Sequence, residues 1–133
     1  MVDKFIFAAS TISALGTGLS AANNYGSGMA NSGTAGYVAI GYDTAPSAAV
    51  DKFAFSDDSR STLGTGLSSA RYSGGAFADS GVAGYQGSGT TAGGSVTTVD
   101  KFSFADDSRT TLAIGVSTAA QFSAGWANSA ALA

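Results

Sequence analysis

Acidic side chains gather in two short clusters whose residue types could bind a ligand. Each cluster is a pair of aspartates followed by a serine and an arginine: Asp57, Asp58 and Arg60 in the first, and Asp106, Asp107 and Arg109 in the second. Carboxylate oxygens repeated in this way could hold calcium or contact a sugar along one rim of a repeating structure.

A turn explains the same clusters without a ligand. Aspartate caps backbone N–H groups in turns, and the arginine would then pair with a neighbouring repeat. Calcium is usually held by about six to eight oxygens, often from a loop in which Asp or Asn alternates with Gly, and the sequence has no such loop. The corresponding place near the N-terminus holds Ala9 and Ser10. We therefore favour the turn.

Tyrosines are the second set of side chains that could contact a ligand. Tyr37, Tyr42 and Tyr85 belong to or follow expected strands. A tyrosine at a strand end either packs in the core or stacks on a sugar ring, and the sequence leaves both interpretations open.

The chain lacks most of the groups that enzymes use. It contains no Glu, His or Cys, which removes the imidazole base, the thiolate nucleophile and the usual zinc and haem ligands. Adjacent aspartates on a strand or turn point apart, whereas glycoside hydrolysis needs two acids across a sugar. Gly64-Thr65-Gly66 is not followed by the Lys-Ser/Thr of a phosphate loop. We expect a protein that is not an enzyme and has neither cofactor nor metal.

The composition favours an ordered β protein with small side chains. Of the 133 residues, 11% are charged and 11% are aromatic, and the net charge is -3; a disordered chain would be more charged and poorer in aromatics. The six Lys and Arg residues form no basic stripe, so we expect no nucleic-acid partner. No apolar run reaches the roughly 18 residues of a membrane span, and the segment from Met1 to Lys4 does not resemble the start of a signal peptide.

The strongest organising feature is a segment that occurs three times. Val50-Asp51-Lys52-Phe53 has counterparts at residues 2–5 and 99–102, at spacings of 48 and 49 residues. Self-similarity at this period is typical of repeat proteins. It predicts a single repeat domain over residues 1–133, with repeats at 2–49, 50–98 and 99–133, the last one truncated. Met29, Phe77 and Trp126 share one repeat position, where we expect them to fill space between units.

Each full repeat contains four expected strands. In the first repeat, period-2 alternation predicts a strand over residues 2–7, and further strands are expected over 12–15, 25–30 and 37–42. The loops from Asp43 to Ala49 and from Gly87 to Gly94 are expected to face outward, the second being the more mobile. The third repeat has counterparts of only three of these strands, which predicts an open strand edge.

These repeats resemble kelch repeats, the blades of one family of β-propellers. The resemblance rests on Leu67-Ser68-Ser69-Ala70-Arg71, on the stretch of small residues that follows, and on Gly84-Tyr85 and Gly87-Ser88-Gly89. Leucine replaces the tryptophan of the family, and the other two repeats have no arginine at the position of Arg71. The Ala/Gly/Ser/Thr-rich composition is also similar to that of kelch-like repeats from environmental tailed phages.

The resemblance implies an all-β fold of three kelch-like four-stranded blade repeats, with the last one incomplete. Propellers close with about four to eight blades, so we expect the propeller to be completed by homo-oligomerisation through open strand edges. The expected function is structural or adhesive, in a phage virion or another extracellular fibre, with other virion proteins or surface glycans as partners. The alternative is a carbohydrate-binding propeller lectin, in which Tyr and Asp side chains form pockets between blades.

Overall fold

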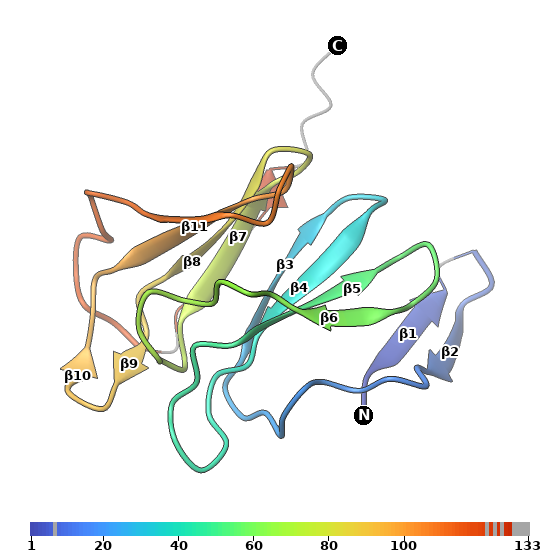
Figure 1. Cartoon of the computed structure of the whole chain (residues 1–133), viewed down its shortest axis with the longest axis horizontal. Helices are drawn as coiled ribbons and strands as arrows, with labels where there is room; N and C mark the ends of the chain where they lie inside the picture. The colour runs from blue at the N-terminus through green and yellow to red at the C-terminus, as the bar shows by residue number, and fades with distance from the viewer. Residues whose placement is uncertain (7, 122, 124, 126, 129–133) are drawn as a thin grey trace.

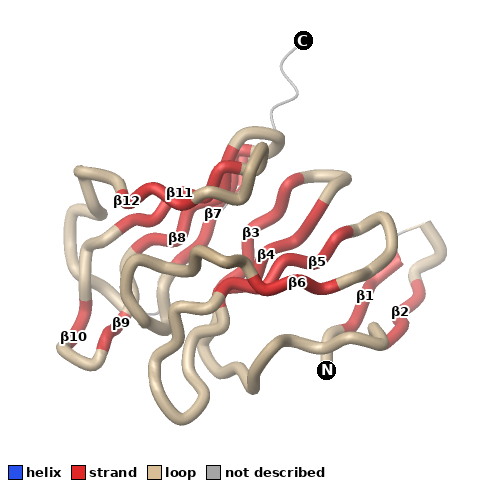
Figure 2. Tube along the Cα trace, viewed as in Figure 1, coloured by secondary structure: helices blue, strands red, loops and turns tan. Residues whose placement is uncertain are grey.

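The computed structural model describes residues 1–6, 8–121, 123, 125, 127 and 128, and every regular element in this part of the chain is a β-strand (Figure 2). The strands are β1 (Asp3–Ile6), β2 (Thr11–Ala14), β3 (Ser27–Asn31), β4 (Ala35–Ala39), β5 (Val50–Ala54), β6 (Arg60–Thr62), β7 (Gly75–Asp79), β8 (Ala83–Gly87), β9 (Thr90–Thr91), β10 (Gly94–Ser95), β11 (Val99–Ser103), β12 (Arg109–Thr111) and β13 (Ala127–Asn128). The predicted all-β class is confirmed. No helix in the described residues is long and apolar enough to span a membrane.

Three units follow one another along the chain (Figure 1). An N-terminal hairpin pairs β1 with β2. The first sheet has the strand order β3-β4-β5-β6, and the second sheet has the order β12-β11-β8-β7-β13. Neighbouring strands are antiparallel except β13, which runs parallel to β7. In Figure 1 the first sheet lies between the N-terminal hairpin and the second sheet.

The two sheets share one hydrogen-bonding register. Tyr37 of β4 lies opposite Lys52 of β5, and Tyr85 of β8 lies opposite Lys101 of β11. In both sheets the glycine before the tyrosine faces a phenylalanine. Because alternate residues of a strand point to opposite faces, each tyrosine and its lysine share a face. The recurring Val-Asp-Lys-Phe segment therefore forms an inner strand of each sheet.

Two expected elements differ from the observed ones. The strand expected over residues 37–42 is β4, which ends at Ala39; the chain turns at Gly41, where φ is 80°, a conformation that favours glycine. The loop expected over 87–94 is not structureless, because β9 and β10 form a short hairpin that begins within it. Phe7 and Trp126 lie outside the described residues.

The core lies where the two sheets face each other. Met29 of β3 and the ring of Phe104 both approach Gly84 of β8, and Tyr37 stacks on Phe104 with ring centroids 5.2 Å apart. All three large side chains are buried. A glycine on one sheet thus accepts a large side chain from the other, which lets sheets of small residues pack closely.

Replacement of Gly84 by alanine should destabilise the protein, because the new Cβ would lie 2.9 Å from Cγ of Met29 in a closed core. Overpacking of this kind costs about 1–3 kcal/mol of unfolding free energy. Gly36→Ala is the matched control, since Cε1 of Phe55 is the nearest atom, at 3.4 Å, and a change within about 0.5 kcal/mol is expected. Urea unfolding measures both variants, and equal losses would contradict this packing.

Candidate docking groove

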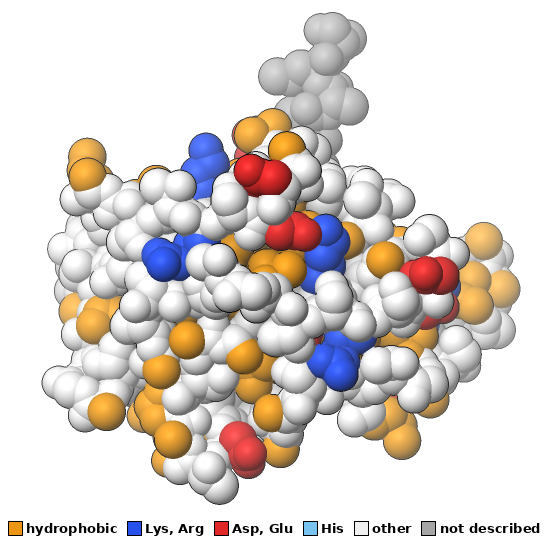
Figure 3. All heavy atoms as spheres, in the orientation of Figure 1, with side chains coloured by type: hydrophobic (Ala, Val, Ile, Leu, Met, Phe, Trp, Pro, Cys, Tyr) orange, Lys and Arg blue, Asp and Glu red, His pale blue; other side chains and the backbone are white. Residues whose placement is uncertain are grey.

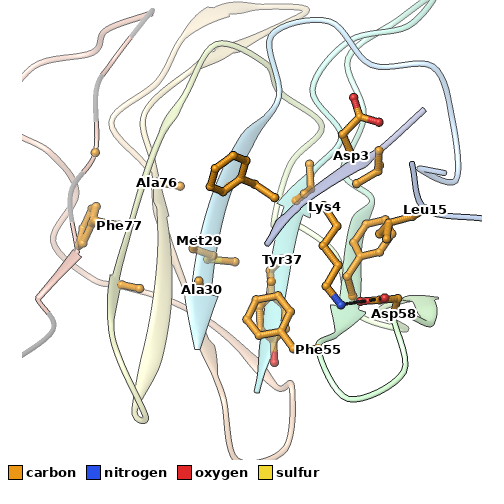
Figure 4. A pocket seen from close by; sticks show the side chains of 18 residues that line it. Asp3, Lys4, Leu15, Met29, Ala30, Tyr37, Phe55, Asp58, Ala76 and Phe77 are labelled. Carbon is orange, nitrogen blue, oxygen red and sulfur yellow. Dashed lines mark hydrogen bonds and ion pairs between the residues drawn. The ribbon is translucent and has the colours of Figure 1, made fainter. Parts of the chain in front are cut away.

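A groove of about 760 Å³ is bounded by the N-terminal hairpin and the two sheets (Figure 4). Its lining is mainly apolar, and the larger apolar side chains in it are Phe5, Leu15, Met29, Tyr37, Phe53, Phe55 and Phe77. Charged groups lie at one end, where Figure 4 shows the amine of Lys4 directed at the carboxylate of Asp58. The groove therefore offers mainly apolar contact, with an ion pair at its edge.

In the described part of the chain, β1 pairs with a strand on one side only. Its counterparts β5 and β11 each pair with two strands, whereas β1 pairs with β2 alone. The carbonyls of Val2 and Ile6 accept hydrogen bonds from N–H groups on the β2 side, those of Leu15 and Ala9. Alternate residues of an antiparallel strand direct their backbone groups to opposite sides, so the backbone of Asp3 points to the open edge.

The N-terminal hairpin also exposes large apolar side chains. Phe5, Ile6 and Ile12 are 47%, 39% and 68% exposed. In the space-filling view, apolar atoms are visible at the right-hand end, over β1 and β2 (Figure 3). Side chains of this kind normally lose most of their exposure when a sheet packs on a neighbour. Over the described residues, the hairpin thus combines a strand paired on one side with large apolar side chains that are exposed to solvent.

Two equivalent places in the sheets are filled differently. In the second sheet, Met29 of the first sheet and the Phe104 ring both approach Gly84, and Phe104 is 8% exposed. Gly36 and Phe55 hold the same positions one repeat earlier. Among the described residues, a Cβ at Gly36 would have only Phe55 within 4 Å, and Phe55 is 45% exposed. The groove at Gly36 thus corresponds to the space at Gly84, which Met29 of the preceding unit fills.

A lysine of each of the first two repeats reaches an aspartate of the next repeat. Lys4 Nζ lies 2.8 Å and 2.9 Å from the two carboxylate oxygens of Asp58. Lys52 Nζ lies 2.6 Å from Asp107 Oδ2, and the Tyr37 hydroxyl donates to Asp107 Oδ1 at 2.8 Å. Burial and the hydrogen bond to Asp107 raise the pKa of Tyr37, and the same carboxylate raises the pKa of Lys52.

Asp100 is a fully buried carboxylate with donors on both oxygens. Oδ2 accepts the Ser68 N–H at 2.8 Å and Arg71 Nη2 at 2.9 Å, and the Thr111 hydroxyl donates to Oδ1 at 2.7 Å. Arg71 is buried too, and it also donates to the carbonyl of Gln86. Burial raises the pKa of Asp100, but the hydrogen bonds and the arginine charge outweigh it, so the pKa lies below its ordinary value.

Asp51 repeats this arrangement in the first sheet. The Ser20 N–H and the Thr62 hydroxyl donate to its two oxygens, each at 2.6 Å. Burial raises the pKa of Asp51, and these hydrogen bonds outweigh it, so the net shift is downward. Asp3 holds the same repeat position in the N-terminal hairpin but is exposed, and Ala14 stands where the other repeats have threonine.

The predicted aspartate pairs divide into two kinds of contact. Asp57 and Asp106 cap turns by accepting the N–H groups of Ser59 and Ser108. Side-chain and backbone hydrogen bonds from these serines lower the pKa of each aspartate. The second member of each pair, Asp58 or Asp107, instead contacts a lysine of the preceding repeat.

The predicted arginines contact their own sheet. Arg60 lies 3.5 Å from Asp51 Oδ1, and Arg109 lies 3.5 Å from Asp100 Oδ1. We expected these arginines to reach a neighbouring repeat, and that expectation is wrong. The contact between repeats is made by lysine instead, because the inner strand directs the lysine towards the next sheet. The arginine, on the outer strand, lies beside the buried aspartate of its own sheet.

The three predicted tyrosines lie in different places. Tyr37 is buried and lines the groove. Tyr85 stacks on Phe77 with centroids 5.0 Å apart, and Tyr42 packs edge-on against Tyr72. Of the nine residues predicted as ligand or inter-blade contacts, Tyr37 and Asp58 are the two that line the groove.

Sequence reasoning missed the buried centres Asp51, Asp100 and Arg71. A signal for the aspartates was present, because the recurring segment places Asp before Lys in every repeat. Its period-2 pattern predicts which residues share a face, but it does not show that both faces are covered. Arg71 carried no such signal, since the other repeats lack it.

No family model matches the chain, and a search of curated proteins found no relative. Among the described residues, no three acidic side chains gather into a group that could hold a metal ion. The geometry of the groove and of the β1 edge suits a docked strand and inserted apolar side chains.

Replacement of Asp100 by asparagine should destabilise the chain strongly. Loss of the carboxylate charge leaves the guanidinium of Arg71 buried without its counter-ion, and breaking a buried pair costs about 3–5 kcal/mol. Asp3→Asn is the matched control, because this aspartate is exposed, and a change within about 0.5 kcal/mol is expected. Urea unfolding of the monomer measures both, and similar losses would contradict the structural role of Asp100.

Acid should destabilise the chain through the same carboxylates. A group whose pKa is lower in the folded than in the unfolded chain contributes stability above the unfolded pKa, and loses it as the pH falls through the folded pKa. For Asp51 and Asp100 this loss begins near pH 4, the unfolded value being about 3.9. Unfolding free energies measured between pH 7 and 2 should fall across this window, with a smaller slope in Asp100→Asn. An unchanged slope in the variant would refute the assignment.

Proposed function

We propose that this chain is a non-enzymatic structural or adhesive protein that assembles through β-strand pairing. The observation that carries the proposal is the open edge of β1 beside an apolar groove. An edge that presents N–H and C=O groups recruits another strand. Pairing there would also cover the apolar side chains of the N-terminal hairpin, which supplies the favourable free energy of association.

We further propose that the repeats are kelch-like blades of a propeller. Support comes from the strand order and register that the two sheets share, from the proximity of β3 to β7, and from the ion pairs between successive repeats. Three blades are too few for a propeller, so a closed ring needs a further chain. Head-to-tail contacts give a ring if the rotation closes and a filament if it does not.

The setting that we propose is a phage particle or another extracellular fibre. The support is compositional, since the small, weakly charged repeats are similar to the kelch-like repeats of tailed phages. Other virion proteins or surface glycans would then be the outer partners.

One observation favours a second function, that of a carbohydrate-binding propeller lectin. Tyr37 and Asp58 line the same groove, and such side chains stack on sugar rings and accept their hydrogen bonds. The Tyr37 hydroxyl and the Asp58 carboxylate are, however, already bonded within the protein. A glycan array separates the functions: repeatable binding to a defined sugar supports the lectin, and large assemblies without sugar binding support the structural protein.

Asp3→Pro should weaken self-association at least tenfold, a change of about 1.4 kcal/mol. Proline removes the N–H that points to the open edge, where an incoming strand would pair. Ala14→Pro is the matched control, because Leu15 faces β1 and its neighbour Ala14 therefore points to the outer edge of the same hairpin. Light scattering over a concentration series, with negative-stain electron microscopy, measures association. A wild-type chain that stays monomeric would refute the proposed function.

A further inference from the structure

We infer that the outward face of the second sheet docks a turn of a partner protein, and that Tyr85 and Lys101 on this face bind the carboxylate of an aspartate in that turn. The outward face is the side of β7, β8 and β11 that points away from the first sheet, and it carries Phe77, Asp79, Tyr85 and Lys101. The inference goes beyond the proposed strand pairing, because it concerns a sheet face and gives the chemistry of a second partner.

The first sheet shows how a face of this kind docks the next sheet. Four side chains share that face, since they lie opposite one another in the register or two residues apart on a strand: Met29, Asn31, Tyr37 and Lys52. The Tyr37 hydroxyl donates to Asp107 Oδ1 at 2.8 Å, and the Lys52 amine donates to Asp107 Oδ2 at 2.6 Å. A tyrosine and a lysine thus hold both oxygens of one carboxylate.

Two further contacts accompany this carboxylate. Met29 approaches Gly84 and is buried, with an exposed fraction of 7%. The side-chain oxygen Oδ1 of Asn31 accepts the Gly81 N–H at 3.0 Å, in the turn between β7 and β8. The docked sheet therefore supplies an aspartate, a glycine that accepts a large side chain and a turn N–H.

The outward face of the second sheet repeats these four positions. Phe77 lies opposite Tyr85, and Tyr85 lies opposite Lys101. Because Gly84 contacts the first sheet and alternate residues of a strand point to opposite faces, Tyr85 points away from the first sheet. The counterparts of the four docked side chains of the first sheet are therefore, in the same order, Phe77, Asp79, Tyr85 and Lys101.

In the described part of the chain, the polar side-chain groups of this face have no partner. The Lys101 amine makes no ion pair there, and neither the Tyr85 hydroxyl nor the Asp79 carboxylate makes a hydrogen bond. Phe77 is 36% exposed, whereas its counterpart on the first sheet is buried. Residues of the segment 116–120 lie beside Phe77 at one end of the face, so the half nearer to the β7–β8 turn is the half left for a partner.

The partner that fits this face carries an aspartate in a turn with left-handed backbone conformation. Asp107 has this conformation, with φ at 58°, and so has Asp58, with φ at 57°, which binds Lys4 of the preceding repeat. A carboxylate presented in this way would neutralise the charge of Lys101 and accept hydrogen bonds from it and from Tyr85. In a second copy of this chain, both aspartates are already paired with lysines of their own chain.

The N-terminal hairpin of a second copy does not offer a carboxylate at this position. Ser10 holds the equivalent place in the turn with the same backbone conformation, at a φ of 52°, but its side chain is a hydroxyl. The outward face therefore favours a partner with an acidic turn over another copy of this chain. The single change Ser10→Asp gives a hairpin that serves as a probe of this preference.

Ser10→Asp should make the chain self-associate at least tenfold more tightly than the wild type, because the new carboxylate gains two charge-assisted hydrogen bonds to the outward face of another copy. Ala9→Asp is the matched control, since it adds the same charge one residue earlier, where the equivalent Asp57 caps its own turn. Its association should equal that of the wild type. Light scattering over a concentration series measures all three chains.

Substitutions on the receiving face identify the binding groups. In the Ser10→Asp background, Lys101→Met should abolish the gain, and Tyr85→Phe should reduce it about fivefold, the loss expected for one hydroxyl. Tyr42→Phe is the control for the second change, because it removes a hydroxyl from another partly exposed tyrosine. Circular dichroism first establishes that each variant is folded.

A mixture tests whether the two surfaces meet. The double variant with Ser10→Asp and Lys101→Met presents the acidic turn only, and the wild type presents the receiving face only. Below the concentration at which the wild type associates by itself, the two should form a one-to-one complex. Equal binding by a double variant with Ala9→Asp and Lys101→Met would overturn the inference.

Two further outcomes would overturn the inference and leave the proposed assembly standing. One is a Ser10→Asp chain that associates no more tightly than the wild type. The other is a loss of wild-type association on Lys101→Met, because the occupant of the face would then be a second copy with Ser10 and the acidic partner would be wrong. The strand-pairing proposal depends on the Asp3→Pro variant, which leaves the outward face unchanged.

Discussion

The architecture depends on two buried carboxylates, those of Asp51 on β5 and Asp100 on β11. Each lies on a strand that pairs on both sides, and each is contacted by a loop of the preceding repeat. Asp51 and Asp100 are inaccessible to solvent and remain charged because a serine N–H, a threonine hydroxyl and an arginine surround them. A buried charge is costly without such partners. The serine comes from the preceding repeat, so the inner strand of one unit can be buried only when the previous unit supplies its loop. Each full sheet therefore contacts the preceding repeat through this serine–aspartate hydrogen bond.

Packing between the sheets follows a second constraint, the scarcity of large side chains. Glycine on β8 accepts Met29, and the Phe104 ring beside it stacks on Tyr37. Since most residues on these strands are small, a few aromatic and thioether groups provide much of the buried apolar area. Phe55 is exposed in the first sheet, whereas its counterpart Phe104 is buried in the second.

The recurring segment, the all-β class and the approximate positions of the strands could be predicted from the sequence, because period-2 alternation and glycine turns are local signals. The roles of the charged residues could not, because they depend on contacts about 50 residues away. Lys4 meets Asp58 and Lys52 meets Asp107 only once two sheets face each other. The groove was likewise not predictable, since it forms only where the N-terminal hairpin and the two sheets meet. Tyr37 was identified as a candidate, but its burial depends on the second sheet.

The contacts between successive units have a consequence for the length of the molecule. Four contacts each join a repeat to the one that follows it: Ser20–Asp51, Ser68–Asp100, Lys4–Asp58 and Lys52–Asp107. An internal duplication of residues 50–98 would therefore meet the same donors and acceptors on both sides, and stability in such arrays is close to a sum over units and their joints. Insertion or deletion of a whole repeat would reuse the same contacts between repeats. The number of repeats can therefore vary in evolution while the interface between them is conserved.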